Sequence, residues 1–291
     1  MKDYVHLAIT ERLRQDQALL ARQLGLTPAE ARLEVHVLAA HACGVERVWL
    51  LAHGDECMSV DSIPSYEQCL VRRLNGEPVA YIVGTREFYG HRLMVNADVL
   101  IPRPETELLV EQALARIEPG DAAQVLELGT GSGAIALAVA LARPNARVCA
   151  VDKRIAALHV AQENSRQLAA TNIELVQSDW WTQLPPQCFD LILSNPPYIA
   201  EQDPHLKQGD VRFEPLSALA AGQDGLDDLR HIIAEAPNWL NAGGWLVLEH
   251  GYDQGAAVRS LLNSAGFAMV ETHRDLAGLD RVSCGWMLGL V

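Results

Sequence analysis

Four consecutive residues, Asn195-Pro196-Pro197-Tyr198, combine a hydrogen-bonding amide, a rigid turn and an aromatic ring. They directly follow the apolar run Phe189–Ser194, which has the length and composition of a buried strand. Two successive prolines cannot continue a hydrogen-bonded ladder, so the chain leaves the sheet here. Because ligands bind at the carboxyl ends of strands in open α/β sheets, we expect a functional site at this point.

The tetrapeptide is suited to orienting a planar –NH₂ group. Such a nitrogen, in an amide or a nucleobase, is a poor nucleophile because its lone pair is delocalised. The Asn195 side-chain oxygen and the Pro196 carbonyl can accept both of its N–H bonds, which fixes its orientation and stabilises the charge that develops on nitrogen. Tyr198 can pack on the flat face of the same group. Taken alone, the motif also fits a rigid loop in which Asn caps its own backbone.

A glycine-rich turn, Gly129-Thr130-Gly131-Ser132-Gly133, follows another predicted strand and precedes a helix. Glycines permit positive φ angles and let a ligand approach the backbone closely. The turn loosely fits a dinucleotide-binding fingerprint. However, the carboxylate of Glu127 beside it would repel a pyrophosphate and attract a cationic sulfonium amino acid. The turn therefore favours a nucleoside without phosphates.

Two further side chains stand at the ends of the next predicted strands. Asp152 is placed to accept hydrogen bonds from both ribose hydroxyls, although an ordinary strand-end carboxylate is the alternative. Trp180 can lie against an adenine face with Asp179 accepting from the exocyclic amine, although filling of the core is the alternative. Glycine turn, ribose acid, adenine wall and tetrapeptide together predict an S-adenosylmethionine site, with S-adenosylhomocysteine as the product.

The elements that must position these residues alternate between strand and helix from residue 122 onward, which predicts a doubly wound α/β sheet. The predicted strands are Gln124–Leu128, Arg147–Val151, Ile173–Gln177, Asp190–Ser194, Trp245–Glu249, Ala268–Glu271 and Val282–Leu288. The predicted helices between them include Ile135–Ala142, Ile155–Gln167 and Leu226–Leu240.

Residues 1–78 read as a small bundle of helices. Thr27-Pro28-Ala29-Glu30 has the form of a capping box and opens a helix that we expect to end near Gly44. Shorter helices are predicted around Arg47–Ala52 and Tyr66–Leu74, separated by residues 61–64. We predict that residues 1–78 form a substrate-recognition domain.

Residues 79–106 change character and predict a β-hairpin linker. Val79–Gly84, Arg86–Gly90 and Leu93–Val95 alternate in the manner of strands around glycine turns. Ile101–Glu107 then leads into an amphipathic helix. The remaining residues, 107–291, form the predicted catalytic domain.

Composition restricts the possible functions. The 291 residues are 49% hydrophobic and 21% charged, with a formal net charge of −14, which argues against a broad duplex-binding face. The cysteines form no C-x-x-C pair and show no zinc-like His spacing, so we predict reduced thiols and no metal site. The amino terminus does not resemble a signal peptide, and no uncharged apolar run reaches membrane-spanning length. We expect a cytoplasmic monomer without stable nucleic-acid binding.

Over nearly its whole length the sequence resembles the HemK/PrmC family, the release-factor glutamine N5-methyltransferases. Besides the two motifs above, the resemblance rests on segments outside the general methyltransferase motifs. These are Gly84–Gly90, Ile101–Glu107, Val211–Pro215 and Leu248–Tyr252. The family has an N-terminal helical domain, a hairpin linker and a seven-stranded Rossmann-like (class I) methyltransferase domain, which agrees with the elements predicted here.

The resemblance implies an acceptor, the glutamine of the Gly-Gly-Gln loop in class 1 peptide-chain release factors. It also implies that the residues from Gly129 to Gly133, Asp152 and Trp180 hold the cofactor, and that the residues from Asn195 to Tyr198 hold the glutamine. The main rival is a nucleic-acid amine methyltransferase, because adenine N6 presents the same planar –NH₂. A nicotinamide-dependent oxidoreductase and a non-catalytic binding protein are the remaining alternatives.

Overall fold

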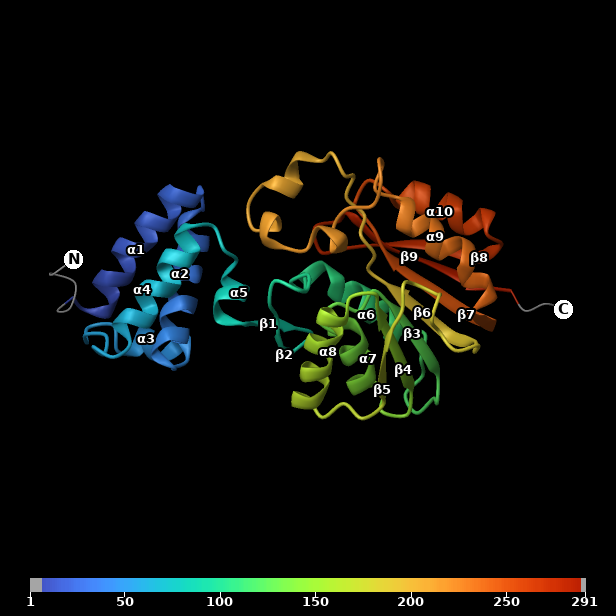
Figure 1. The fold of residues 1–291 in the computed structure, drawn as a ribbon, viewed down its shortest axis with the longest axis horizontal. Helices are drawn as coiled ribbons and strands as arrows, with labels where there is room; N and C mark the ends of the chain where they lie inside the picture. Colours follow the sequence, from blue (N-terminus) through green and yellow to red (C-terminus); the bar gives the residue numbers. More distant parts are fainter. Residues whose placement is uncertain (1–6, 289–291) are drawn as a thin grey trace. The chain divides into compact units, whose positions relative to one another are not determined.

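The structure is a computed structural model that describes residues 7–288, so the first six and last three residues of the predicted domains lie outside it (Figure 1). The chain forms two compact units. The helical unit comprises the chain up to Gly84 together with Lys207–Phe213, and the sheet unit comprises Thr85–Leu206 and the chain from Glu214 onward. Across residues 7–288, no helix is both long enough and apolar enough to cross a membrane.

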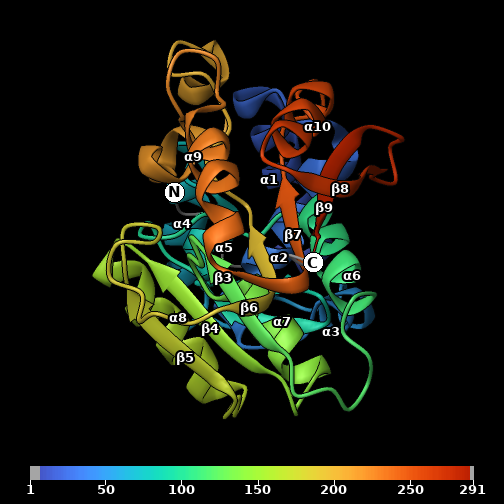
Figure 2. The same cartoon turned by 90° about the vertical axis from the view of Figure 1, so that its right-hand side faces the viewer.

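The sheet unit is built on a sheet that has seven strands within residues 7–288, in the order β5-β4-β3-β6-β7-β9-β8 (Figure 2). The strands are β3 (Gln124–Leu128), β4 (Arg147–Asp152), β5 (Ile173–Gln177), β6 (Phe189–Ser194), β7 (Leu240–Glu249), β8 (Phe267–Arg274) and β9 (Asp280–Met287). Strands β5, β4, β3, β6 and β7 pair in parallel, and β9 runs antiparallel to both β7 and β8. The predicted doubly wound sheet is confirmed, and the carboxyl ends of β4, β3 and β6 lie next to one another.

Helices cover both faces of this sheet. They are α6 (Glu107–Leu114), α7 (Ala134–Ala142), α8 (Ile155–Gln167), α9 (Asp227–Glu235) and α10 (Gly255–Ser264). Successive strand residues point to opposite faces, so Val125 and Leu193 pack with α6 and α7, whereas Leu126 and Ile192 pack with α9 and α10. Helix α8 lies beside α7 (Figure 1) and packs on β4 and β5. The central strands β3, β4 and β6 are therefore buried on both faces, which explains their nearly continuous apolar runs.

One predicted helix of the sheet unit is too long. The stretch Leu226–Leu240 was expected to be helical throughout, but α9 ends at Glu235 and Leu240 already begins β7. The intervening residues Ala236–Asn238 form a 3₁₀ turn. The physical reason is Pro237, which lacks an amide hydrogen and clashes with the preceding turn of a helix.

The predicted hairpin exists but is shorter than expected. Strands β1 (Thr85–Phe88) and β2 (His91–Met94) pair antiparallel. The connecting residues Tyr89 and Gly90 have φ angles of 49° and 75°, the backbone signs of a type I′ turn. The amide of Tyr89 donates to the carboxylate of Glu107 over 2.9 Å, which joins the hairpin turn to the start of α6.

The helical unit contains α1 (Ile9–Leu24), α2 (Pro28–Cys43), α3 (Arg47–Ala52), α4 (Ile63–Leu74) and α5 (Val79–Val83). The predicted capping box of α2 is confirmed, because the Thr27 hydroxyl accepts from the Glu30 amide and the Glu30 carboxylate accepts from the Thr27 amide. The helix ends at Cys43, and the next residue, Gly44, caps it in the left-handed conformation with φ 65°.

Two predictions in this unit are corrected by the structure. Val79–Val83 was predicted as strand but forms α5, which buries Ile82 in the core of the helical unit and ends at the left-handed Gly84. A short apolar run does not distinguish strand from helix by its periodicity, and tertiary packing decided this case. Ile63 was placed in a spacer but begins α4, since Pro64 fits the first turn of a helix.

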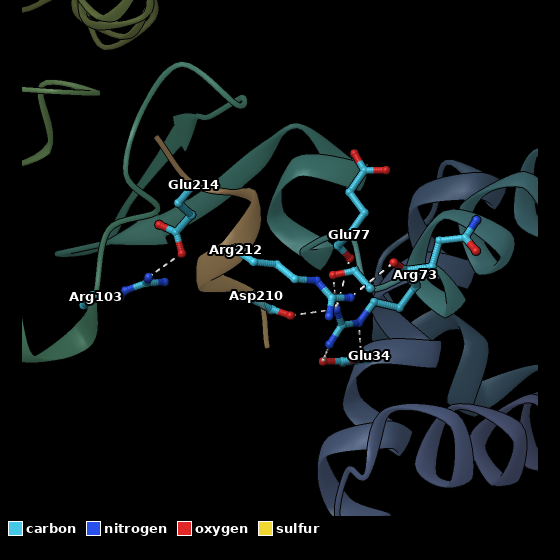
Figure 3. A network of polar contacts seen from close by, with 9 residues as sticks. Glu34, Arg73, Glu77, Arg103, Asp210, Arg212 and Glu214 are labelled. Carbon is cyan, nitrogen blue, oxygen red and sulfur yellow. Dashed lines mark hydrogen bonds and ion pairs between the residues drawn. The ribbon is translucent and has the colours of Figure 1, made fainter. Parts of the chain in front are cut away.

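A buried arginine joins distant parts of the helical unit (Figure 3). The guanidinium of Arg73, 4% exposed, contacts the carboxylate of Glu34 over 2.7 Å and that of Asp210 over 2.8 Å. It also donates to the carbonyls of Gly76 and Glu77. Asp210 thereby fixes Lys207–Phe213 to helices that precede it by more than a hundred residues.

Replacement of this arginine, Arg73→Ala, is expected to lower the free energy of unfolding of the helical unit by about 2–3 kcal/mol, because it leaves two carboxylates without their cation. Hydrogen exchange of the helical-unit amides, followed by mass spectrometry on the full chain, measures the effect. Arg22→Ala, at an exposed position of α1, is the matched control and should change stability by less than about 0.5 kcal/mol. Equal protection in both variants would contradict the prediction.

Candidate active site

The glycine turn connects β3 to α7 and has the conformation that its sequence predicts. Gly129, Gly131 and Gly133 have φ angles of 75°, 55° and 82°. The amides of Gly129 and Thr130 donate to the carbonyl of Val151 on β4, over 2.9 and 2.8 Å. A side chain at Gly129 would lie 3.5 Å from the indole ring of Trp180. The turn is therefore anchored to the neighbouring strand while the bare backbone of Gly129 faces the tryptophan.

Glu127 lies beneath this turn rather than beside a ligand. Its side chain is 1% exposed, and one carboxylate oxygen accepts from the Thr130 hydroxyl over 2.5 Å and from the Ala136 amide over 3.0 Å. Thr130 and Ser132 are buried as well. Burial raises the pKa of Glu127 to about 8. The three side chains support the turn from inside, and Glu127 does not line the cleft described below.

The raised pKa of Glu127 has a consequence for stability. Between 4.5 and about 8, the folded protein keeps a proton on Glu127 that the unfolded chain has lost, so stability falls as pH rises through this range. Glu127→Gln keeps an acceptor oxygen without ionising, and we expect its melting temperature to fall less steeply with pH than that of the parent. Glu118→Gln, at an exposed position, is the control that should retain the parent slope. Parallel melting curves for all three proteins would refute the assignment.

Asp152 is the last residue of β4, and it both contacts the glycine turn and lines the cleft described below. One carboxylate oxygen accepts from the Gly131 amide over 3.0 Å, and the other accepts from the Arg154 amide over 2.9 Å. A carboxylate has about four lone-pair sites, so acceptors remain for two hydroxyl groups of a bound ribose. The residue thus fits its predicted role and also shapes the turn.

An open cleft lies beside the glycine turn. It brings together residues that follow several of the parallel strands: Gly129, Gly131, Asp152, Lys153, Arg154, Ala157, Ser178, Asp179, Trp180, Asn195 and Pro197, with Asp98, Val99, Leu100, Ser217 and Ala218 completing the wall. An aromatic ring, three aspartate carboxylates and exposed glycine backbone are a suitable set of partners for an adenosine with an amino-acid tail. S-adenosylmethionine therefore fits the residues present.

The tetrapeptide leaves β6 at the edge of this cleft. Asn195 and Pro197 contribute to its lining, and both Pro196 and Pro197 are buried as whole residues. The Asn195 amide nitrogen donates to the Thr106 hydroxyl over 3.2 Å. The Tyr198 hydroxyl donates to a carboxylate oxygen of Glu249 over 3.3 Å. Burial raises the pKa of the Tyr198 phenol, so it remains a hydrogen-bond donor.

Glu214 holds one wall of the cleft, a role that sequence reasoning missed. Its buried carboxylate accepts from the Ile101 amide over 3.0 Å and forms an ion pair with Arg103 (Figure 3). Residues 98–100 directly precede Ile101 in sequence, and residues 217–218 follow shortly after Glu214. Both segments line the cleft. Arg103 and Glu214 lie in two segments, Ile101–Glu107 and Val211–Pro215, that resemble the HemK/PrmC family in sequence. Only the tertiary structure shows that the two side chains form an ion pair.

Asn164 is a second missed residue. It is fully buried on α8, and its amide nitrogen donates to the carbonyls of Met94 and Ser132 over 3.0 and 2.8 Å. Its oxygen accepts from the Met94 amide over 2.6 Å. Asn164 therefore ties the hairpin strand β2 to the glycine turn. A single Asn in a helix gives no sequence signal for such a role.

His250, which stands next to the end of β7, is structural. It is fully buried, and its ring nitrogens contact the Gly251 carbonyl at 2.9 Å and the Ser283 hydroxyl at 2.8 Å. Burial lowers the pKa of the imidazole, which favours the neutral ring. Both nitrogens are occupied by these contacts, so the ring does not serve as a base for the cleft.

Known proteins resemble this chain in both units. The Methyltransferase small domain family matches residues 104–210, and the PrmC N-terminal domain family matches residues 17–84. The release factor glutamine methyltransferase of Xylella fastidiosa (strain 9a5c) is 49% identical over 263 residues, which cover 89% of this chain and 96% of that protein. The release factor glutamine methyltransferase of Escherichia coli (strain K12) is 48% identical over 254 residues, 87% of this chain and 91% of that protein.

A solved structure shares the fold at much lower identity. The crystal structure of a methyltransferase from Pyrococcus furiosus superposes with a TM-score of 0.53 at 18% identity, and the match covers 77% of this chain and 100% of that chain. The two structures share the arrangement of strands and helices. At 18% identity this match shows the fold alone and carries no information about the acceptor.

Proposed function

Because the chain belongs to the release factor glutamine methyltransferase family, we propose that it transfers a methyl group from S-adenosylmethionine to a glutamine side chain of a class 1 peptide-chain release factor. The acceptor atom is the amide nitrogen (N5) of the glutamine in the Gly-Gly-Gln loop. The observation that carries the proposal is that Asn195 and Pro197 line the same cleft as Gly129, Asp152 and Trp180.

The cofactor side of the cleft binds by nucleoside and backbone contacts. Asp152 would accept hydrogen bonds from the ribose hydroxyls, Trp180 would pack on the adenine, and the backbone of Gly129 and Gly131 would hold the amino-acid end. Glu127 acts indirectly by supporting the turn through Thr130 and Ala136. Bound S-adenosylmethionine supplies a methyl group on a positively charged sulfur, which makes the methyl carbon electrophilic.

The acceptor side orients the glutamine amide. The Asn195 side-chain oxygen and the Pro196 carbonyl accept its two N–H bonds, which turns the nitrogen lone pair toward the methyl carbon. The glutamine nitrogen would take the methyl group while the sulfur leaves as S-adenosylhomocysteine, and both acceptor oxygens would stabilise the positive charge that develops on nitrogen. The nitrogen then releases one proton to solvent, so no base has to stand beside it. Tyr198 packs close to the acceptor and keeps the loop rigid.

The division of labour along the chain follows from the same proposal. The predicted recognition domain, residues 1–78, would bind the release factor together with Val79–Gly84, which belong to the same helical unit. The hairpin within residues 85–106 is the linker, and the remainder of residues 107–291, apart from Lys207–Phe213, carries out the transfer. A protein substrate that works on the ribosome implies a cytoplasmic enzyme, which we expect to act as a monomer and without stable nucleic-acid binding. The net charge of −14 supports a protein acceptor over a nucleic acid.

The test is methyl transfer from labelled S-adenosylmethionine to three acceptors: a class 1 release factor, its loop Gln→Ala variant, and unmethylated DNA. We expect label on the intact factor alone. Label on DNA would instead assign the site to adenine, and label on the Gln→Ala variant would move the acceptor to another residue. If none of the three acquires label, the proposed acceptor is wrong.

A further inference from the structure

The acceptor tetrapeptide must be held in place at both of its ends. A shift of about 1 Å in a group that orients a reacting atom can cost about 100-fold in rate. The first end continues from β6, where the Ser194 hydroxyl donates to the Leu128 carbonyl on β3 over 2.8 Å. Pro196 and Pro197 have no amide hydrogens with which to anchor themselves. The position of the second end therefore depends on contacts at Tyr198.

The carbonyl oxygen of Tyr198 is held by Gln254, the residue that directly precedes α10. The side-chain nitrogen Nε2 of Gln254 donates to this carbonyl over 3.0 Å and to the carbonyl of Gly225 over 3.3 Å. The carbonyl of Asp224 lies 3.5 Å from the same nitrogen. One –NH₂ group thus joins the end of the tetrapeptide to the chain that returns toward α9.

The orientation of the Gln254 amide is fixed by backbone groups. Its oxygen Oε1 accepts from the Gly251 amide over 2.9 Å. A backbone amide can only donate and a backbone carbonyl can only accept, so the oxygen must face Gly251 and the nitrogen must face Tyr198 and Gly225. Turned over, the side chain would place its –NH₂ against an N–H and its oxygen against two carbonyl oxygens. The contacts therefore permit one orientation.

The turn that carries Gln254 is itself anchored to the sheet. The Gln254 amide donates to the Gly251 carbonyl over 2.9 Å, which closes the turn. The preceding residue, the buried His250, donates its amide to the carbonyl of Arg281 on β9 over 3.0 Å. Its ring contacts the Gly251 carbonyl and the Ser283 hydroxyl. Gln254 thus projects from a fixed corner between β7 and α10.

Close approach of the backbone at Gly225 completes the arrangement. Gly225 has a φ angle of 74°, and a Cβ atom there would lie 2.3 Å from the Tyr198 carbonyl oxygen and 3.0 Å from Nε2 of Gln254. Both distances are shorter than van der Waals contact, so a side chain at this position would displace the contact. At its other end, the Tyr198 hydroxyl contacts Glu249 on β7 over 3.3 Å. Both ends of Tyr198 are therefore held from the same corner.

We propose, building on the function above, that Gln254 is a positioning residue for methyl transfer. It holds the last carbonyl of the tetrapeptide, so that the Pro196 carbonyl and the Tyr198 ring keep their places at the acceptor. The two prolines transmit this restraint, because their fixed φ angles leave the chain from Asn195 to Tyr198 few ways to move. Within residues 7–288, Gln254 is not among those that line the cofactor cleft, so it acts on the acceptor side.

The test compares Gln254→Glu with Gln254→Met, using the full chain and a class 1 release factor. Both substitutions keep nearly the length and shape of glutamine. Glutamate keeps an oxygen for Gly251 but turns an ionised oxygen toward two carbonyl groups, so we expect kcat to fall about 100-fold. Methionine removes the donor without adding a repulsion, so we expect a fall of about tenfold. The Kd of S-adenosylmethionine should stay within about threefold in both variants.

The matched control is Gln162→Glu, which makes the same change of charge at an exposed position of α8 and should behave like the parent. Rates are measured in single turnovers well below the melting temperature of each variant, so a loss of stability alone does not lower them. Parental kcat in either Gln254 variant overturns the proposal. So does a loss of cofactor binding that parallels the loss of rate. If Gln254→Glu does not fold, as judged by its melting curve, Gln254→Met alone decides.

Failure here is distinct from failure of the proposed function. The parent enzyme must first methylate the release factor, and if it does not, the function itself is wrong. If it does, and the Gln254 variants behave like the parent, then only the positioning role is lost.

Discussion

Asn195→Ala is expected to lower kcat for methylation of a release factor by about 100- to 1,000-fold, the range found when one acceptor or donor that stabilises a transition-state charge is removed. The alanine variant leaves the glutamine nitrogen with one oriented N–H bond instead of two, so its lone pair no longer points at the methyl carbon. The Kd of S-adenosylmethionine should change by less than about threefold, because the glycine turn, Asp152 and Trp180 are untouched.

Single-turnover kinetics measure the rate, and calorimetry measures cofactor binding. Asn263→Ala, at an exposed position of α10, is the matched control and should behave like the parent. Loss of cofactor binding together with transfer would mean that Asn195 mainly supports the cofactor, and the proposed orientation of the acceptor would need revision.

Asp152→Asn is expected to weaken S-adenosylmethionine binding about 10- to 100-fold, which corresponds to the loss of one or two hydrogen bonds to a charged acceptor. The carboxylate now accepts from the amides of Gly131 and Arg154 with one oxygen each. Asparagine can accept at only one end, so its –NH₂ group must face one of these amides and the turn shifts. The variant therefore loses ribose contacts and turn geometry together.

The kinetic signature separates this variant from the previous one. At saturating cofactor, kcat of Asp152→Asn should stay within about threefold of the parent while KM for S-adenosylmethionine rises. Asp55→Asn removes the same charge from an exposed position of the helical unit and serves as the control. An unchanged KM for the cofactor would show that Asp152 is only a strand-end carboxylate.

Most of the fold was predictable because its signals are local. Strands β3 and β5 and helix α8 begin and end at the predicted residues, since an apolar run and its flanking turn residues specify both. The capping box of α2 and the exit of the chain from β6 at two prolines likewise depend on neighbours in sequence. The errors occurred where a local pattern was ambiguous, as in Val79–Val83, whose burial in the helical unit decided for helix.

The candidate site likewise has features that follow from local sequence and features that depend on tertiary packing. The sequence by itself determined that a glycine turn, Asp152, Trp180 and Asn195 follow parallel strands, and a parallel sheet brings such strand ends together. The sequence also determined the conformation of the turn, because its glycines adopt positive φ angles that are costly for other residues.

Only the tertiary structure decided which polar groups stand behind the site. Glu127 proved to be a buried support of the turn, and Thr106 and Glu249 proved to contact Asn195 and Tyr198 across 89 and 51 residues of sequence. A single sequence does not reveal such pairs, because it does not distinguish a buried carboxyl group from an exposed one. Their partners are set by how the sheet and its helices pack.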